Sequence, residues 1–129
     1  MLQLVSMDHG HSVTDRIIGA AIEVHRQLGP GLLETPYKRA LCVELAHQDL
    51  RVETNRCIPM EYRGELIGEY IADLIVENEV VVEVKSVSHL EPVFTAQLVT
   101  YLRLTNLHVG LLLNFNAARL IDGLKRVVR

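Results

Sequence analysis

Two apolar segments separated by a stretch of helix length most constrain the fold of this 129-residue chain. The first, "EVVVEVKS" (residues 79–86), contains three consecutive valines. The second, "LHVGLLLNF" (residues 107–115), is apolar on both faces, as in a central strand of a covered sheet. Between them, Pro92 lies where the first turn of a helix tolerates proline, and helical spacing continues to about Leu104. Because a strand, a crossover helix and a returning strand form a right-handed unit, we predict a parallel strand pair.

Two helices and two further strands are predicted before this unit. Apolar residues recur at helical spacing from Thr14 to Leu28, where "LGPG" ends the helix, and a second helix is predicted from Leu32 to about Gln48. The apolar positions of these helices are Ile18, Ala21, Ile22, His25 and Leu28 in the first and Leu33, Tyr37, Ala40, Leu41 and Leu45 in the second. Strand-type segments follow at residues 52–62 and 65–76, joined by a turn at residues 63–64.

The order of elements, α, α, β, β, β, α, β, predicts a single α/β domain with one mixed sheet and helices on both faces. The tail from Ala117 is predicted to be either a short helix or an edge strand. An apolar content of 49% suits a real core and excludes a disordered or fibrous chain. We expect the domain to span residues 14–129, preceded by a mobile N-terminal segment, residues 1–13. Met7 is an alternative start to Met1.

Composition also limits where the protein is located in the cell and which partners it binds. The apolar runs are too short to cross a membrane, and the N-terminus lacks the pattern of a signal peptide. Cys42 and Cys57, in apolar surroundings and without metal or redox spacing, are interpreted as reduced structural residues, so a cytoplasmic location is expected. A net charge of −3 excludes a basic nucleic-acid coat protein, but it is compatible with an enzyme that binds nucleic acid locally.

The hairpin "ADLIVENEVVVEVKS" (residues 72–86) places charged residues among apolar ones. Because side chains alternate along a strand, Glu83 and Lys85 point to the same face. Burying a carboxylate costs several kcal/mol without a compensating partner, so either these residues escape the core or something binds them. Taken alone, the hairpin slightly favours an ordinary exposed polar face.

The length of the turn in this hairpin decides where Asp73 points. A two-residue turn would turn Asp73 away from Glu83, whereas a three-residue connection at residues 77–79 pairs Val76 with Val80 and sets Asp73 opposite Glu83. Two carboxylates so placed repel each other unless a cation or a shared proton compensates them. We predict the three-residue connection, or a bulge of the same effect, and a divalent metal ion held by the pair.

Further polar residues occur at helical spacing on either side of the hairpin. Gly31, Glu34 and Tyr37 follow at steps of three in "GPGLLETPY"; alone, this pattern is typical of an N-terminal acid beside a core tyrosine. Gln97 and Tyr101, four residues apart, lie one above the other on a helix face, and Gln97 is either a surface residue or a buried one with a partner.

The sequence contains no motif for other kinds of catalytic or cofactor site. His25, on the apolar face of the first helix, is interpreted as a core histidine with a hydrogen-bond partner. Phosphate-binding glycine loops, GxSxG, HExxH and a Cys–His nucleophile pattern are all absent. The acids and Lys85 are therefore the candidates for catalysis.

The candidate residues occur in the order Asp73, Glu83-Val84-Lys85, Gln97 and Tyr101. On an αβββαβ core, this order resembles the PD-(D/E)XK nuclease superfamily. More narrowly, "GPGLLETPY" is similar to the signature of the GxxExxY family, small bacterial and archaeal proteins within that superfamily. The blocks "IIGAAIEVHRQLGPGLLE", "ADLIVENEVVVEVKS" and "AQLVTYLRLTNLHVGLLLNF" are also similar, and the resemblance runs from about Thr14 to Val128.

The resemblance implies a Mg²⁺ or Mn²⁺ ion held by Asp73, Glu83 and the backbone carbonyl of Val84. Glu34 would reach the metal directly or through water. Lys85 would orient the attacking water or stabilise charge on the phosphate.

The resemblance also implies that Gln97 and Tyr101 position the substrate backbone or brace the site. Ala72 stands where the superfamily pattern has proline, a departure that leaves the metal ligands in place. Because no cysteine cluster is present, no iron–sulfur cluster is expected, and no nucleotide cofactor is expected either.

We therefore expect a divalent-metal-dependent nuclease that hydrolyses phosphodiester bonds, in DNA first. The alternative is a catalytically silent nucleic-acid-binding or protein-interaction module on the same fold. Because no acid, lysine or helix residue of the pattern has been lost, the enzyme is favoured; a purely structural oligomerisation domain explains none of the polar residues. Since no broad basic surface is present, a second copy or a partner protein is expected to aid DNA binding.

Overall fold

The computed structural model describes the backbone of residues 2–129 and the side chains of residues 13–129. Its elements are α1 (Leu2–Leu28), α2 (Glu34–His47), β1 (Val52–Tyr62), β2 (Glu65–Val76), β3 (Val80–Lys85), α3 (Pro92–Thr105), β4 (Val109–Asn114), a short 3₁₀ helix η1 (Leu120–Gly123) and β5 (Leu124–Val128). This order confirms the predicted arrangement, and the tail contains both a short helix and an edge strand. The predicted mobile segment, residues 1–13, lies outside the described side chains except for Val13.

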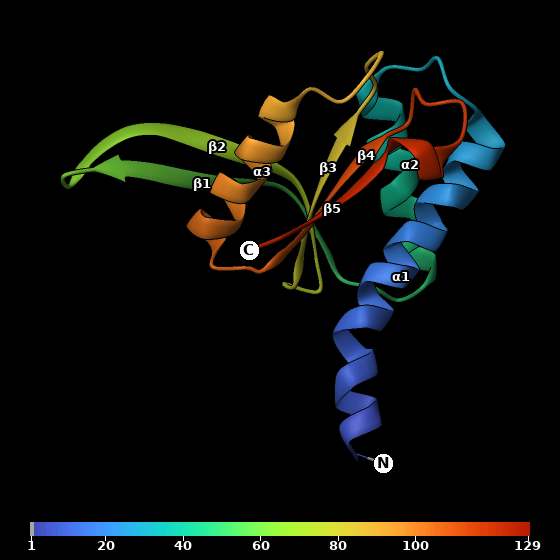
Figure 1. Ribbon diagram of the computed structural model, residues 1–129, viewed down its shortest axis with the longest axis horizontal. Helices are drawn as coiled ribbons and strands as arrows, with labels where there is room; N and C mark the ends of the chain where they lie inside the picture. Colours follow the sequence, from blue (N-terminus) through green and yellow to red (C-terminus); the bar gives the residue numbers. More distant parts are fainter. Residues whose placement is uncertain (1) are drawn as a thin grey trace.

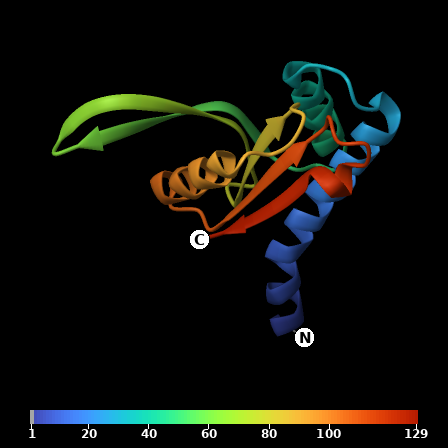
Figure 2. The ribbon, with the colours of Figure 1, turned by 45° about the horizontal axis from the view of Figure 1, so that its top comes forward.

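The five strands form one mixed sheet in the order β1-β2-β3-β4-β5. Strands β3 and β4 pair in parallel, and the other neighbours are antiparallel, which confirms the predicted crossover through α3. Helices α1 and α2 pack on one face of the sheet and α3 packs on the other (Figures 1 and 2). Among the described helices, none combines the length and hydropathy that a bilayer-spanning segment requires.

The buried face of α1 agrees with the predicted one at Ala21 and His25 but not at Ile22 and Leu28, which are each 44% exposed. The buried side chains of the described part of this helix are Val13, Thr14, Ile17, Ala20, Ala21, Val24 and His25. Both stripes have helical spacing, and the stripe with two alanines packs on the core because small side chains let the helix approach its neighbours closely. In the second helix Leu33 is also wrong as a core residue: it lies in extended backbone before the first turn and is 80% exposed.

The connection between β2 and β3 has three residues, as predicted. Val76 pairs with Val80, and the amide of Glu79 donates to the carbonyl of Val76 at 2.9 Å. Glu77 and Asn78 both adopt the left-handed conformation, with φ of 53° and 51°. Asparagine tolerates this conformation well, and the carboxylate of Glu77 accepts a hydrogen bond from the Arg51 amide that ties the turn to the sheet.

The hairpin of β1 and β2 continues far beyond the helices as a projecting arm (Figures 1 and 2). Its turn at Arg63 and Gly64 has the predicted two residues, both with positive φ, and Tyr62 pairs with Glu65. The pairing register shifts between Met60 and Glu61, and residues 61–67 are all exposed. The base of the arm belongs to the packed sheet, and the outer part extends into solvent.

Candidate active site

The carboxylates of Asp73 and Glu83 lie where β2 separates from β3. The regular pairing of these strands ends at Leu74 and Val82. Beyond that pair, the amide of Asp73 donates to Glu83 Oε2 at 3.1 Å, and the amide of Val84 donates to Asp73 Oδ2 at 2.9 Å. Each carboxylate therefore binds the backbone of the opposite strand, and the two acids share one gap in the sheet.

An irregularity in β2 creates this gap. Ala72 and Ile75 pack in the same core on the α3 side although they are three residues apart, so the alternation of side chains breaks between them. The partner strand is also irregular at this point, because Asn55, opposite Asp73, has a φ of 53°. Asp73 thereby leaves the regular strand and contacts groups from α2 as well as Glu83.

The carbonyl of Val84 is directed toward the same gap. The carbonyl of Lys85 accepts from the amide of Phe115, on the β4 side of β3. The amide of Val84 points the other way, toward β2, and donates to Asp73. Because the N–H and C=O of one strand residue point to the same side, the carbonyl of Val84 also points toward β2. Two carboxylates and one backbone carbonyl therefore surround the gap.

Glu83 is 5% exposed, an unusual position for a carboxylate. Burial, and after it the negative charge of Asp73, raise its pKa to about 7, against the opposing hydrogen bonds from Tyr70 and the Asp73 amide and the charge of Lys85. The Tyr70 hydroxyl donates to Glu83 Oε2, and burial together with the Glu83 charge raises the pKa of Tyr70. The two acids thus repel each other in a poorly solvated place, where a bound cation is favourable.

Helix α3 contributes one wall of the site. The ring of Tyr101 stacks on Tyr70 with the ring planes 10° apart, so Tyr101 supports the residue that binds Glu83. The ammonium of Lys85 lies 4.6 Å from the centre of the Phe94 ring. Gln97 lies between Phe94 and Tyr101 on the same helical stripe, but its side chain is exposed, so its buried alternative is wrong.

Helix α2 contributes the opposite wall. Lys38 forms an ion pair with Asp73 Oδ1 at 3.6 Å and also donates to Asn55 Oδ1. Glu34 lies one turn earlier on the same stripe, exposed at the helix start, and forms no ion pair or hydrogen bond with Asp73 or Glu83 in the described part of the chain. The hydroxyl of Ser86 donates to the carbonyl of Leu32 at 2.5 Å, which holds this helix start beside the end of β3.

Comparison with known proteins settles the family. The model of the PD-(D/E)XK nuclease superfamily matches residues 11–127. The chain belongs to this superfamily. No curated protein and no solved structure matches the chain.

The donor atoms of this PD-(D/E)XK domain fit a hard divalent cation. Among the described residues no group of three or more His, Cys, Asp or Glu side chains is placed to hold a metal. Two carboxylates and a carbonyl are, however, a set that Mg²⁺ accepts, because it keeps several waters and shares its sphere with substrate phosphates. The absence of histidine and cysteine from the gap does not suit zinc, which prefers nitrogen and sulfur ligands.

Three residues of the site were missed from the sequence: Lys38, Asn55 and Tyr70. Lys38 carried a usable signal, because it lies four residues after Glu34 and so on the same helical stripe. Tyr70 carried none. In a regular strand it would lie on the opposite face from Asp73, three residues later, and only the irregularity in β2 brings both beside Glu83.

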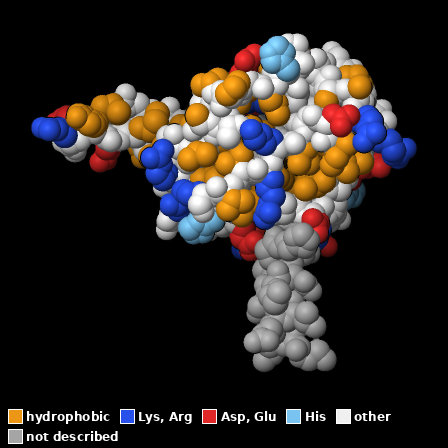
Figure 3. Space-filling model, viewed as in Figure 1, with side chains coloured by type: hydrophobic (Ala, Val, Ile, Leu, Met, Phe, Trp, Pro, Cys, Tyr) orange, Lys and Arg blue, Asp and Glu red, His pale blue; other side chains and the backbone are white. Residues whose placement is uncertain are grey.

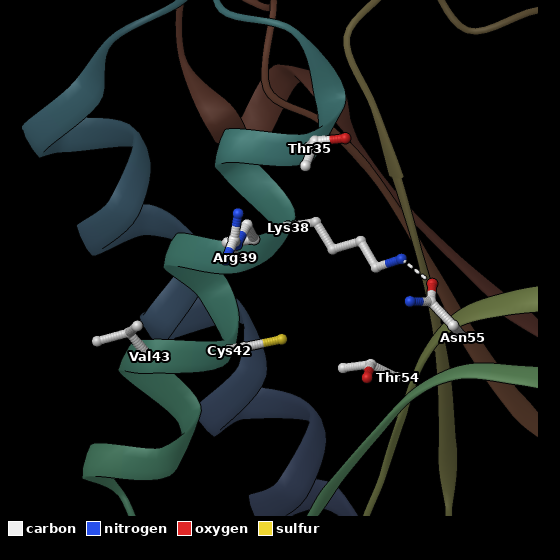
Figure 4. Close-up of a pocket in the computed structure, with 7 residues that line it drawn as sticks. All are labelled: Thr35, Lys38, Arg39, Cys42, Val43, Thr54 and Asn55. Atoms are coloured by element: carbon white, nitrogen blue, oxygen red, sulfur yellow. Dashed lines mark hydrogen bonds between the residues drawn. The ribbon is translucent and has the colours of Figure 1, made fainter.

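A cavity of about 640 Å³ between α2 and β1 adjoins the site (Figure 4). Lys38 and Asn55 line it and also contact each other, and Lys38 in turn contacts Asp73. Arg39, Thr35 and Thr54 add polar and cationic groups to the lining, and Cys42 and Val43 add apolar ones. A chain of negative phosphates is the kind of ligand that such a lining favours.

Two residues of interest prove to be structural. Tyr37 is fully buried and stacks on Phe115 with ring centres 4.7 Å apart. Its hydroxyl accepts a hydrogen bond from the Leu32 amide at 3.1 Å and donates one to the Gly29 carbonyl. This confirms a core tyrosine, and its role is to shape the loop before α2. His25 is also confirmed as a core histidine, with Nε2 bonded to the Ala117 carbonyl at 2.8 Å. Cys57, in contrast, is exposed, so its predicted apolar surroundings are wrong.

The raised pKa of Glu83 predicts a pH-dependent stability in chelating buffer. The folded protein keeps the Glu83 proton up to a pKa of about 7, above the ordinary value of 4.5, so it holds more protons than the unfolded chain between these values. The free energy of unfolding therefore falls as the pH rises from about 4.5 to about 8. As the pH rises over this range, the free energy of unfolding of Glu83→Gln is expected to increase relative to that of wild type by up to about 3 kcal/mol.

Urea unfolding followed by circular dichroism measures this difference. Glu44→Gln, a half-exposed glutamate of α2 outside the site, is the matched control and should follow wild type at every pH. Parallel pH profiles for wild type and Glu83→Gln would contradict the expected effect.

Proposed function

We propose that this PD-(D/E)XK domain is a Mg²⁺- or Mn²⁺-dependent nuclease that hydrolyses phosphodiester bonds, with DNA as its first substrate. The observation that carries the proposal is the shared gap of Asp73 and Glu83, with the Val84 carbonyl directed into it and Lys85 next along β3. The domain belongs to the GxxExxY family, with Gly31, Glu34 and Tyr37 as the signature residues, and acts in the cytoplasm.

Asp73, Glu83 and the Val84 carbonyl would hold the metal ion. A hard divalent cation on oxygen ligands neutralises charge on the scissile phosphate and makes a water nucleophilic near neutral pH. Lys85 lies two residues beyond Glu83 and, from its place beside Phe94, puts a positive charge next to the phosphate or orients the attacking water.

The remaining polar residues act on the edges of this site. Glu34, exposed one turn from Lys38, would reach the metal directly or through water. Tyr101 braces Tyr70 and so holds Glu83 in place. Gln97, exposed on the stripe of Tyr101, is free to bind the substrate backbone.

The cavity between α2 and β1 is the route for the substrate strand next to the cleaved bond. Lys38 connects the cavity to Asp73, and Arg39 adds a second positive charge on the same helix (Figure 4). A cation held by Asp73 would compete with the ion pair between Asp73 and Lys38, and it would leave Lys38 available to a phosphate.

The experiment that tests the proposal incubates the purified protein with single- and double-stranded DNA and RNA in Mg²⁺, Mn²⁺ or chelator. DNA cleavage is expected only with metal, and Glu83→Gln is expected to abolish it because a neutral amide binds Mg²⁺ poorly. Glu44→Gln should cleave at the wild-type rate. Cleavage that survives chelator or Glu83→Gln would point to contamination, and intact substrates throughout would favour the catalytically silent binding module.

A further inference from the structure

Tyr70 lies on β2 at the base of the β1–β2 arm, which projects from the body of the molecule (Figure 3). Its ring packs against the core on the α3 side, to which Ile58 of the neighbouring strand also belongs. The ring also stacks on Tyr101 of α3, with the ring planes 10° apart. Because the strand and the stack hold the ring, the hydroxyl is directed to one place, Oε2 of Glu83.

The two oxygens of the Glu83 carboxylate are used unequally. Oε2 accepts two hydrogen bonds, one from the Tyr70 hydroxyl and one from the amide of Asp73 at 3.1 Å. Within the described part of the chain, Oε1 accepts none. A carboxylate oxygen offers about two lone-pair positions, so both positions of Oε2 are occupied and those of Oε1 are free. Glu83 therefore has one oxygen available to a cation.

Of the two donors to Oε2, only Tyr70 acts through its side chain. The amide of Asp73 belongs to the backbone of β2 and is present whatever the side chains are. The Tyr70 hydroxyl is therefore the group that decides whether Oε2 keeps a free lone-pair position. Without this hydroxyl, the Glu83 carboxylate is able to bind a cation with both oxygens.

The number of oxygens that a carboxylate gives affects which cation a site prefers. Mg²⁺ is small, requires a nearly octahedral set of ligands and keeps several waters, and Mn²⁺ also accepts octahedral oxygen ligands. Ca²⁺ takes about six to eight oxygen ligands at longer distances, often including a carboxylate that binds through both oxygens. A Glu83 that gives one oxygen suits the smaller cations, and a Glu83 that gives two suits Ca²⁺ better.

We infer that Tyr70 is a positioning residue that makes Glu83 a one-oxygen ligand and thereby directs the site toward Mg²⁺ and Mn²⁺ rather than Ca²⁺. The inference rests on the metal site of the proposed function, but it requires neither cleavage nor a particular nucleic acid. Tyr101 contributes indirectly, because its ring holds the ring of Tyr70 in place.

Tyr70→Phe tests the inference, because it removes the hydroxyl and keeps the ring that stacks on Tyr101. Mn²⁺ binding to the protein without nucleic acid is measured from the loss of the electron paramagnetic resonance signal of free Mn²⁺. Ca²⁺ binding is measured by its competition with Mn²⁺. In Tyr70→Phe the Kd of Mn²⁺ is expected to rise about tenfold, the lower end of the usual cost of losing a hydrogen-bond partner of a metal ligand. The Kd of Ca²⁺ is expected to stay the same or to fall.

The ratio of the two dissociation constants separates a positioning role from a merely structural one. A general loosening of the site would weaken both cations by the same factor and leave the ratio unchanged. Tyr62→Phe is the matched control, because it removes a hydroxyl from an exposed tyrosine at the end of β1, and it should keep the wild-type ratio. Circular dichroism checks that both variants are folded.

Two results would overturn the inference, and they differ in what they say about the proposed function. A wild-type ratio in Tyr70→Phe, whether or not both affinities fall, would overturn the inference and leave the proposed nuclease in place. A wild-type protein that binds no Mn²⁺ would overturn the inference together with the proposed metal site.

Discussion

Lys85→Met is expected to lower the rate of Mg²⁺-dependent DNA cleavage by about 10²–10³-fold, the usual cost of removing one group that stabilises transition-state charge. Methionine keeps most of the length of the lysine stem beside Phe94 and removes only the charge. The free energy of unfolding is therefore expected to change by no more than about 1 kcal/mol, the scale of a lost cation–π contact. Single-turnover cleavage of labelled DNA, with urea unfolding alongside, measures both quantities.

Lys125→Met is the matched control, because Lys125 is an exposed lysine of β5, two strands away from Lys85 in the sheet. It should cleave at the wild-type rate. If Lys85→Met also cleaves at that rate while Glu83→Gln is inactive, then the metal site is real but Lys85 has no catalytic role.

Tyr37→Ala is expected to lower the free energy of unfolding by about 3–5 kcal/mol, the range for removing a fully buried aromatic side chain. The change opens a cavity against Phe115 and leaves the loop before α2 without its hydrogen bonds to Gly29 and Leu32. Tyr37→Phe keeps the ring and removes only the hydroxyl, so it is expected to cost about 1–3 kcal/mol. Urea unfolding followed by circular dichroism measures both variants.

The control for these variants is Leu33→Ala, in the same loop. Leu33 is 80% exposed, so its removal should change the free energy of unfolding by less than about 0.5 kcal/mol. An effect of Tyr37→Phe as small as that of Leu33→Ala would show that the hydroxyl does not hold the loop.

Local signals in the sequence were strong enough to predict the elements and one important register. Alternating and continuous apolar runs predicted β1 and β2 with their bounds, and Pro92 predicted the start of α3. Asn78 favoured a left-handed turn, and with it the pairing of Val76 with Val80. These predictions depend on interactions between residues close in the chain, which the sequence displays directly.

The predictions that failed depend on contacts between distant parts of the chain. Two overlapping stripes of α1 have helical spacing, and packing against the rest of the core selected the one with Ala20 and Ala21 rather than Ile22. Lys38 and Tyr70 come to Asp73 and Glu83 from different elements. Their approach depends on how α2, β1 and β2 meet, and no spacing in the sequence records it.

The sequence by itself determined the candidates for catalysis, because the order of Asp73, Glu83, Lys85, Gln97 and Tyr101 resembles the PD-(D/E)XK pattern, whereas the spacing within the hairpin alone left an ordinary polar face open. Only the tertiary structure decided how the acids meet: β2 breaks its alternation opposite Asn55, so that Asp73 and Glu83 face one gap instead of two regular strand faces. It also decided that the β1–β2 arm stands clear of the body with its apolar residues exposed. The physical reason is the same in both cases, since burial and strand separation are properties of packed elements and not of any single segment.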